Sequence, residues 1–295
     1  MTTIKRYKVA GHIFAIECND DERAVMTNYK PFITEDSANP LFTLHIGSEH
    51  TSAITEHVFT DVSDDDMPRI EVSRTAEGWL IEESVNKSGD ICLHIYTNND
   101  FSEAWLAYET PNKRFAIDNA AMLIYAFASA KYKTLEMHSS VTVKDGSAYM
   151  FLGRSGTGKS THSRQWQTAF PESWLLNDDN PIVRINDDGT VMVYGSPWSG
   201  KTPCYKNACA PVRAFVKLVQ APYNKIHKLR LPEAYAYVLS SSSGLKIVPE
   251  MMDQMYATIA EVIQKVSSFG LECLPDVDAA HTCLKGIDES AVVGA

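Results

Sequence analysis

Short runs in which apolar and polar residues alternate, rich in β-branched and aromatic side chains, dominate the first third of the chain. Polar or glycine-containing turns separate them, for example at residues 19–21 and 87–89. This pattern predicts a β-rich N-terminal domain over residues 1–112, built on a small antiparallel sheet, with the acidic stretch 61–66 as a solvated loop. The predicted strands cover residues 7–17, 41–47, 69–73, 78–83, 90–96 and 103–108.

The periodicity changes after residue 112, where longer helical patterns alternate with short apolar strands. Residues 140–143 and 147–152 flank the turn residues Asp145 and Gly146, which predicts a hairpin, and a second hairpin is predicted at residues 187–189. We therefore expect an α/β domain with α+β features and a mixed sheet over residues 113–295. Its other predicted strands are 173–176, 182–185, 191–194, 212–220 and 271–274, and its predicted helices are 118–132, 159–167, 232–240, 250–267 and 277–285.

The composition of the 295 residues, 44% hydrophobic and 22% charged, is that of a soluble globular protein. A net charge of −10 argues against nucleic acid as the main partner. No signal peptide and no run of eighteen apolar residues is found, so we expect a cytoplasmic protein without a membrane partner. The six cysteines form no CxxC pair and are interpreted as reduced thiols. A homo-oligomer is compatible with the sequence.

Residues 153–160, GRSGTGKS, fit the phosphate-binding pattern G-x-x-x-x-G-K-[ST]. An apolar strand precedes the loop and a helical segment follows it, so the positive end of the helix dipole would face a bound anion. Lys159 would supply positive charge to the outer phosphates, and the Ser160 hydroxyl would ligate Mg²⁺. The expected nucleotide-binding residues are Gly153, Ser155, Gly156, Thr157, Gly158, Lys159, Ser160 and Thr161.

Two adjacent carboxylates, Asp178 and Asp179, follow the next apolar strand after the loop. Such a pair can divide the work, one holding Mg²⁺ and the other accepting a proton from an attacking hydroxyl. The sequence does not assign the two roles. The similar pair Asp187-Asp188 precedes Gly189 between two strands and is interpreted as a hairpin tip.

Two further features lie close to this pattern. His138 precedes the hairpin that carries the loop; its imidazole can contact a phosphate or a metal, or it can be a structural residue. The small-residue loop 195–201 would bring Lys201 and backbone amides to the transferred group, or it is an ordinary turn.

Residues 137–161, followed by residues 177–179, resemble the nucleotide core of HPr kinase/phosphorylases and of ATP-dependent phosphoenolpyruvate carboxykinases. Both families have a histidine, a phosphate loop and an Asp-Asp pair in this order. The resemblance implies that His138, Lys159, Ser160, Asp178 and Asp179 act at the nucleotide, the metal and the reacting group. The helix before His138 carries no lysine ahead of Lys131, which departs from the carboxykinases. Ser139 replaces the glycine of the true HPr enzymes, which departs from those.

We therefore expect a Mg²⁺-dependent kinase that transfers the γ-phosphoryl group of ATP to a hydroxyl on a protein, a peptide or a small molecule. The catalytic residues would be Asp178, Asp179, His138 and Lys159, and the metal ligands Ser160, Asp178 and Asp179. The alternative is a nucleotide-responsive binding protein, which would hold ATP in the same loop but would not need a base.

Overall fold

The computed structural model of the chain describes residues 2–47, 50–61, 68–86, 89–200, 202–244 and 248–293. It is a mixed α/β structure that divides into two compact units, residues 1–129 with 245–249 and residues 130–244 with 250–295. This division differs from the boundary expected at residue 112. Helix α2 (Lys113–Ser129) belongs to the first unit, where the Tyr125 hydroxyl donates to the carbonyl of Val9 at 2.9 Å.

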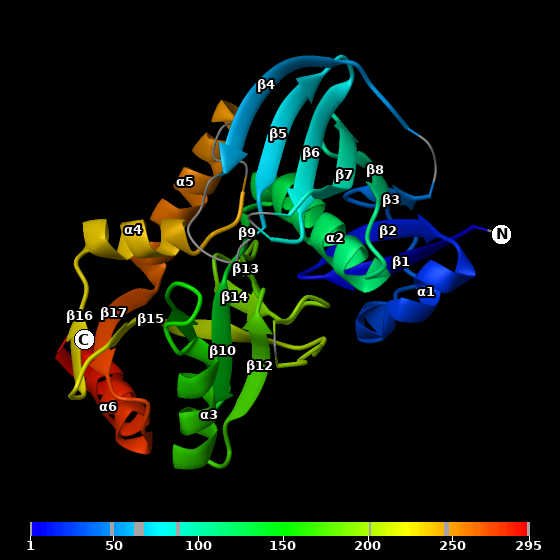
Figure 1. Cartoon of the computed structure of the whole chain (residues 1–295). Helices are drawn as coiled ribbons and strands as arrows, with labels where there is room; N and C mark the ends of the chain where they lie inside the picture. Colours follow the sequence, from blue (N-terminus) through cyan, green and yellow to red (C-terminus); the bar gives the residue numbers. More distant parts are fainter. Residues whose placement is uncertain are drawn as a thin grey trace. The chain divides into compact units, whose positions relative to one another are not determined.

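The first unit is an eight-stranded sheet in the order β1-β2-β3-β8-β7-β6-β5-β4, with α2 lying against it (Figure 1). The sheet is mixed, not antiparallel as predicted, because β3 runs parallel to both β2 and β8. Its strands are β1 (Thr3–Val9), β2 (His12–Cys18), β3 (Thr43–Ile46), β4 (Ile54–Asp61), β5 (Ile70–Thr75), β6 (Gly78–Ser84), β7 (Ile91–Asn98) and β8 (Glu103–Tyr108).

The single strand predicted over residues 7–17 is instead the hairpin β1–β2. Ala10 and Gly11 both have positive φ, 48° and 81°, and this conformation reverses the chain in two residues. The polar segment 19–21 is not a simple turn, since it begins helix α1 (Asp20–Val25). Asn19 accepts from the Glu22 amide at 2.9 Å, and Glu22 accepts from the Asn19 amide at 3.0 Å, which caps that helix.

Two further elements of the first unit, strand β4 and the 3₁₀ helix η1 (Thr27–Phe32), were not predicted from the sequence. The acidic stretch 61–66 lies, apart from Asp61, outside the described residues, as do Lys87 and Ser88 of the expected turn.

The second unit is a mixed sheet in the order β12-β10-β11-β15-β14-β13-β9, with β17 paired to β15 and β16 to β17. The long strand β15 holds it together, since it runs parallel to β11 and β17 and antiparallel to β14. Its elements are η2 (Ala130–Tyr132), β9 (Thr134–Glu136), β10 (Ser139–Lys144), β11 (Ser147–Leu152), α3 (Lys159–Ala169), β12 (Trp174–Asp179), β13 (Ile182–Ile185), β14 (Val191–Tyr194), β15 (Cys209–Gln220), β16 (Lys225–Lys228), α4 (Leu231–Ser240), α5 (Pro249–Lys265), β17 (Ser267–Cys273) and α6 (Val277–Val293).

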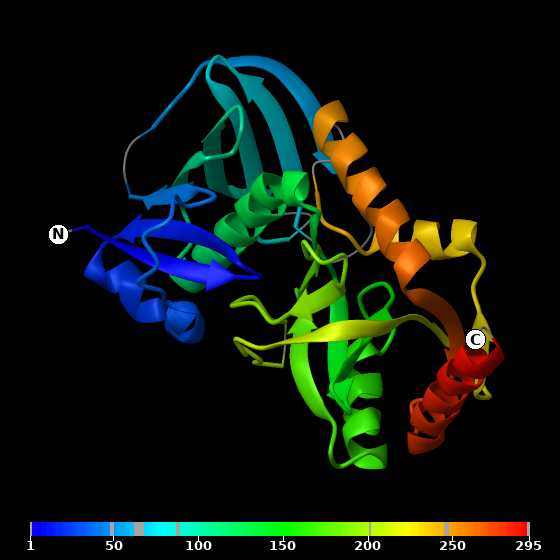
Figure 2. The same cartoon turned by 180° about the vertical axis from the view of Figure 1, so that it is seen from behind.

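Helices cover both faces of this second sheet, so that it is the middle of three layers. On one face, Trp166 of α3 and Ala280 of α6 pack against Phe151 and Val216 of the sheet. On the other face, Val238 of α4 and Ile259 of α5 join a core that includes residues of β10, β13 and β14. Figure 2 shows α3 and α6 side by side, as their contacts require.

Both predicted hairpins of the second unit are confirmed. Strands β10 and β11 pair through a turn in which Asp145 and Gly146 have φ of 49° and 72°, and β13 pairs with β14 across Gly189. The short strands β9 and β16 were not predicted. All six cysteines are free. Within the part of the chain that the structure describes, no helix is long and apolar enough to span a membrane.

Candidate nucleotide and phosphoryl-transfer site

The glycine-rich loop connects the end of β11 to the start of α3. Gly153, Gly156 and Gly158 have φ of 154°, 78° and 105°, a region of backbone conformation that residues with a Cβ rarely adopt. The exposed residues 154–156 form the tip of the loop, and Gly158 is the N-cap of α3 without any side-chain cap. The loop therefore leaves the positive end of α3 open to an anion.

Lys159 reaches back from the first turn of α3 underneath this loop. Its side chain donates to the carbonyl of Gly153 at 2.9 Å, and its Nζ lies 2.9 Å from Nε2 of His138. Burial lowers the pKa of this lysine, while the nearby carboxylates of Asp179 and Asp178 act in the opposite direction. The ammonium is thus held at the loop by the protein before any phosphate is bound.

The two adjacent aspartates reach different partners. Asp178 is buried, and its Oδ1 accepts from the Ser160 hydroxyl of α3 at 3.0 Å. Asp179 places Oδ1 2.9 Å from Nε2 of His138, with its side chain 37% exposed. Because successive residues of a strand point to opposite faces, adjacency in the sequence separates the two carboxylates in space. They pair across the sheet with Ser140 and Ser139 of β10, which precedes the loop-bearing strand.

His138 links the second aspartate to the lysine. Its amide donates to the carbonyl of Ser241 at 2.7 Å, just after α4, which fixes the residue in place. A proton on Nε2 would be held by Asp179, and without that proton the same nitrogen accepts from Lys159. The structure therefore brings together every catalytic residue expected from the sequence.

Residues 195–200 of the small-residue loop lie beside the aspartate pair. The Gly200 amide donates to the carbonyl of Asp178 at 2.8 Å, and the Ser199 hydroxyl donates to that carbonyl at 2.9 Å. A Cβ on Gly200 would lie 2.8 Å from Oδ2 of Asp179, so a larger residue at this position would displace that carboxylate. Asp179 itself has φ of 132°, a conformation rare outside glycine and typical of functional sites. Lys201 lies outside the described residues.

A buried amide that the sequence analysis did not single out supports this loop. Asn177 donates to the Ser196 hydroxyl at 3.2 Å and to the carbonyl of Trp198 at 3.0 Å. The Ser196 hydroxyl in turn donates to the carbonyl of Asn180 at 2.6 Å. Asn177 and Ser196 are fully buried, so this network fixes the backbone on both sides of Asp178 and Asp179.

Glu136 is the second residue missed from the sequence. It is completely buried, and neither carboxylate oxygen has a partner with regular hydrogen-bond geometry among the described residues. Burial raises its pKa to about 8; the Ser243 hydroxyl opposes the rise and the charge of Asp179 adds to it. The available signal was an acidic residue between the apolar Leu135 and Met137.

A cavity of about 330 Å³ opens beside the loop, on the face of the sheet that carries α3 and α6. This volume lies in the range of small-molecule sites. Burial lowers the pKa of the lining residue His162 to about 4, and its Nε2 accepts from Trp166 at 3.0 Å, so the neutral ring carries its proton on Nδ1. The other lining residues are Gly156, Thr157, Gly158, Thr161, Leu218, Gln220, Ala221, Cys273, Leu274 and Pro275.

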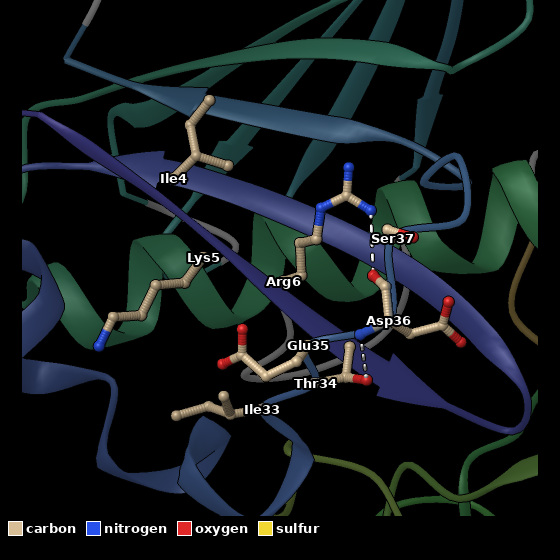
Figure 3. Close-up of a pocket in the computed structure, with 8 residues that line it drawn as sticks. All are labelled: Ile4, Lys5, Arg6, Ile33, Thr34, Glu35, Asp36 and Ser37. Carbon is tan, nitrogen blue, oxygen red and sulfur yellow. Dashed lines mark hydrogen bonds between the residues drawn. The ribbon is translucent and has the colours of Figure 1, made fainter.

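A larger cavity, of about 550 Å³, lies in the first unit along the edge strand β1 (Figure 3). Two of its charged residues, Arg6 and Asp36, already have partners within the unit. Arg6 donates to the carbonyls of Asp36 and Ala38 at 3.2 and 2.6 Å, and Lys8 pairs with the Asp36 carboxylate at 3.0 Å. This cavity contains none of the residues expected to act in catalysis.

No protein-family model matches the chain, and no match was found among curated proteins. Among the described residues, no group of three or more His, Cys, Asp or Glu side chains is arranged to hold a metal by itself. The residues Ser160 and Asp178 still fit a nucleotide-bound Mg²⁺. This ion takes one or two protein oxygens and completes its shell with phosphates and water.

Proposed function

We propose that this chain is an ATP-dependent kinase that transfers the γ-phosphoryl group to a hydroxyl. The observation that carries the proposal is the division of the aspartate pair, with Asp178 bonded to Ser160 beside the loop and Asp179 bonded to His138 beside Lys159. A protein that only senses a nucleotide needs the first arrangement but has no use for the second.

Nucleotide binding would use the loop and the neighbouring cavity. The loop amides and the Lys159 ammonium would hold the β- and γ-phosphates, where positive charge and N–H donors meet. The 330 Å³ cavity is continuous with this loop through Gly156 and Gly158, and Leu218, Leu274 and Pro275 give it apolar walls suited to a nucleobase.

Ser160 and Asp178 would hold Mg²⁺, which would neutralise charge on the phosphates when it is bound. Asp179 would accept the proton of the acceptor hydroxyl as its oxygen forms a bond to the γ-phosphorus and the bond from that phosphorus to ADP breaks. His138 would orient the Asp179 carboxylate, and Lys159 would stabilise charge on the transferred group.

The proposal includes an HPr-kinase-like nucleotide core in the second unit. The support for it is that His138, the loop and the aspartate pair, which carry the sequence resemblance, also meet in space. The acceptor is left as a hydroxyl-bearing protein, peptide or small molecule.

The test uses the full chain with Mg²⁺ and γ-labelled ATP, together with serine-containing peptides and small polyols as acceptors. Label on an acceptor other than water supports a kinase. Binding of Mg²⁺–AMP-PNP by calorimetry without any transfer indicates the alternative, a nucleotide-responsive binding protein. Failure to bind the nucleotide overturns both.

A further inference from the structure

Arg154 and Lys217 place two positive charges beside the glycine-rich loop without a negative partner. Neither side chain lies within ion-pair distance of a carboxylate among the described residues. Lys217 is opposite Leu152 in the pairing of β15 with β11, and Leu152 is the last residue before the loop that contains Arg154. Two cations held near each other repel, so this arrangement has a cost that a bound anion would offset.

Lys217 is also partly withdrawn from water. Its Nζ lies 3.8 Å from the ring centroid of Tyr237 on α4, a cation–π contact that compensates only part of the lost hydration. Burial lowers the pKa of this lysine, and the nearby Arg154 lowers it further. An isolated lysine with a merely structural role would extend into solvent, as this four-carbon side chain can.

Lys217 lies on the opposite face of the sheet from the proposed nucleobase cavity. Residues of β15 alternate between faces, and Leu218 contributes to the cavity on the α3 face whereas Lys217 contacts α4 on the opposite face. Two backbone hydrogen bonds through Ser241 connect Tyr237 to His138. The Tyr237 carbonyl accepts from the Ser241 amide at 3.2 Å, and the Ser241 carbonyl accepts from the His138 amide at 2.7 Å.

We propose that Arg154 and Lys217 form an anion site that binds a carboxylate or phosphate group of the phosphoryl acceptor. The inference rests on the proposed kinase function and narrows its substrate class to acceptors that carry an acidic group near the reacting hydroxyl. The nucleobase and the acidic group would then occupy opposite faces of the sheet, with the loop between them.

The first experiment titrates inorganic phosphate, and separately acetate, into the full chain saturated with Mg²⁺–AMP-PNP at constant ionic strength, followed by calorimetry. Loss of one charge-assisted contact should weaken phosphate binding about tenfold in Lys217→Met and in Arg154→Met. Lys217→Arg keeps the charge and should retain binding. Lys285→Met, which removes an exposed lysine of α6, is the matched control. Acetate binding that follows the same pattern identifies the site as one for carboxylates as well.

Three results are decisive. Equal phosphate binding by wild type and both methionine variants overturns the anion site. A tenfold loss of AMP-PNP affinity in these variants assigns the cations to the triphosphate and overturns the acceptor role. If the wild type binds no AMP-PNP, the kinase proposal fails, and phosphate titration into the nucleotide-free variants still decides whether the two cations bind an anion. Circular dichroism melting curves identify any variant that fails to fold.

The second experiment compares acceptors. In the γ-labelled ATP assay, serine peptides with aspartate or phosphoserine next to the serine should be labelled about tenfold faster than their asparagine and serine counterparts. Lys217→Met should abolish this preference, so that acidic and neutral peptides are labelled at the same rate as each other. An equal preference in wild type and variant would refute the assignment.

Discussion

Asp178-Asp179 and Asp187-Asp188 are the same dipeptide; the first pair ends strand β12, and the second follows strand β13. The first pair is held by Ser160, His138 and the amide of Gly200. The second is an exposed hairpin tip, where Asp188 accepts from the Thr190 amide at 2.8 Å, a partner within its own turn. Identical side chains therefore acquire different chemistry from the partners that the fold brings to them.

The same contrast holds for the glycine that lies beside each pair in the structure. Gly189 needs its positive φ of 81° to close the hairpin, which is a local requirement. Gly200 is distant in sequence from Asp179, and a Cβ there would push against the Asp179 carboxylate. A glycine whose missing side chain makes room for a residue distant in the sequence is stronger evidence of a functional site than a glycine that only closes its own turn.

The largest effect is expected when one aspartate of each pair is replaced by asparagine and the transfer rates of the two variants are compared. Asp179→Asn should lower the initial rate of label transfer by about 10²–10⁴-fold, because the amide cannot accept the hydroxyl proton. Affinity for Mg²⁺–AMP-PNP should stay within a fewfold. Asp188→Asn is the control and should transfer at the wild-type rate; similar losses in both variants would remove the distinction between the pairs.

The next effect concerns Glu136, which has a raised pKa and a neighbour in Asp179. The folded protein keeps this proton up to about pH 8, whereas the unfolded chain releases it near the usual glutamate pKa of 4.5. The unfolded state thus binds fewer protons between these values, and the free energy of unfolding falls as the pH rises. Relative to Glu136→Gln, the wild type should lose roughly 3 kcal/mol of stability between pH 5 and pH 8.

Urea unfolding of both proteins at several pH values measures this difference. The variant removes only the ionisable group and keeps a side chain of similar volume. Parallel stability curves for wild type and variant would show that the Glu136 carboxyl is ionised at neutral pH in the folded protein.

A smaller effect is expected on the Mg²⁺ dependence of the transfer rate. Asp178→Asn removes the negative charge beside Ser160, and the Mg²⁺ concentration that gives half the maximal transfer rate should rise about tenfold or more. Asp187→Asn, the first residue of the hairpin pair, should leave that concentration unchanged. An Asp178→Asn enzyme with normal Mg²⁺ dependence would contradict the assignment of this carboxylate to the metal.

The smallest effects compare the two glycines. Gly200→Ala should displace the Asp179 carboxylate and slow transfer about tenfold, because catalysis depends on a precise position of the base. Gly189→Ala should destabilise the hairpin by about 1 kcal/mol without changing the rate. Thermal melts and transfer assays on both variants separate the two, and a slowed Gly189→Ala enzyme would argue against a purely local role for that turn.

The parts of the site that could be predicted from the sequence are those with a local pattern. The loop glycines, Lys159 and Ser160 stand in one short segment whose backbone conformation depends on their own residue types. The hairpin at Asp145 and the long helices were predicted for the same reason. Strand β9 was missed because three residues are too few to show a period, and β16 because the segment Lys225–Lys228 contains a single apolar residue.

The rest of the site could not be found in this way, because its residues have no fixed spacing from the loop. Glu136 and Lys217 come from two different strands, and their unusual surroundings arise only when those strands pair with others. The sequence also assigned α2 to the second unit, since periodicity indicates a helix but not the sheet against which it packs.

The sequence by itself determined a glycine-rich turn between a strand and a helix, the lysine within it, and a pair of acidic residues further on. These follow from the steric freedom of each residue and from its chemical group, which belong to the chain whatever its fold. The tertiary structure decided which aspartate faces Ser160 and which faces His138, and that Lys217 lies near Arg154 without a carboxylate partner among the described residues. Those outcomes depend on strand order and register, which are set by long-range packing of the whole core.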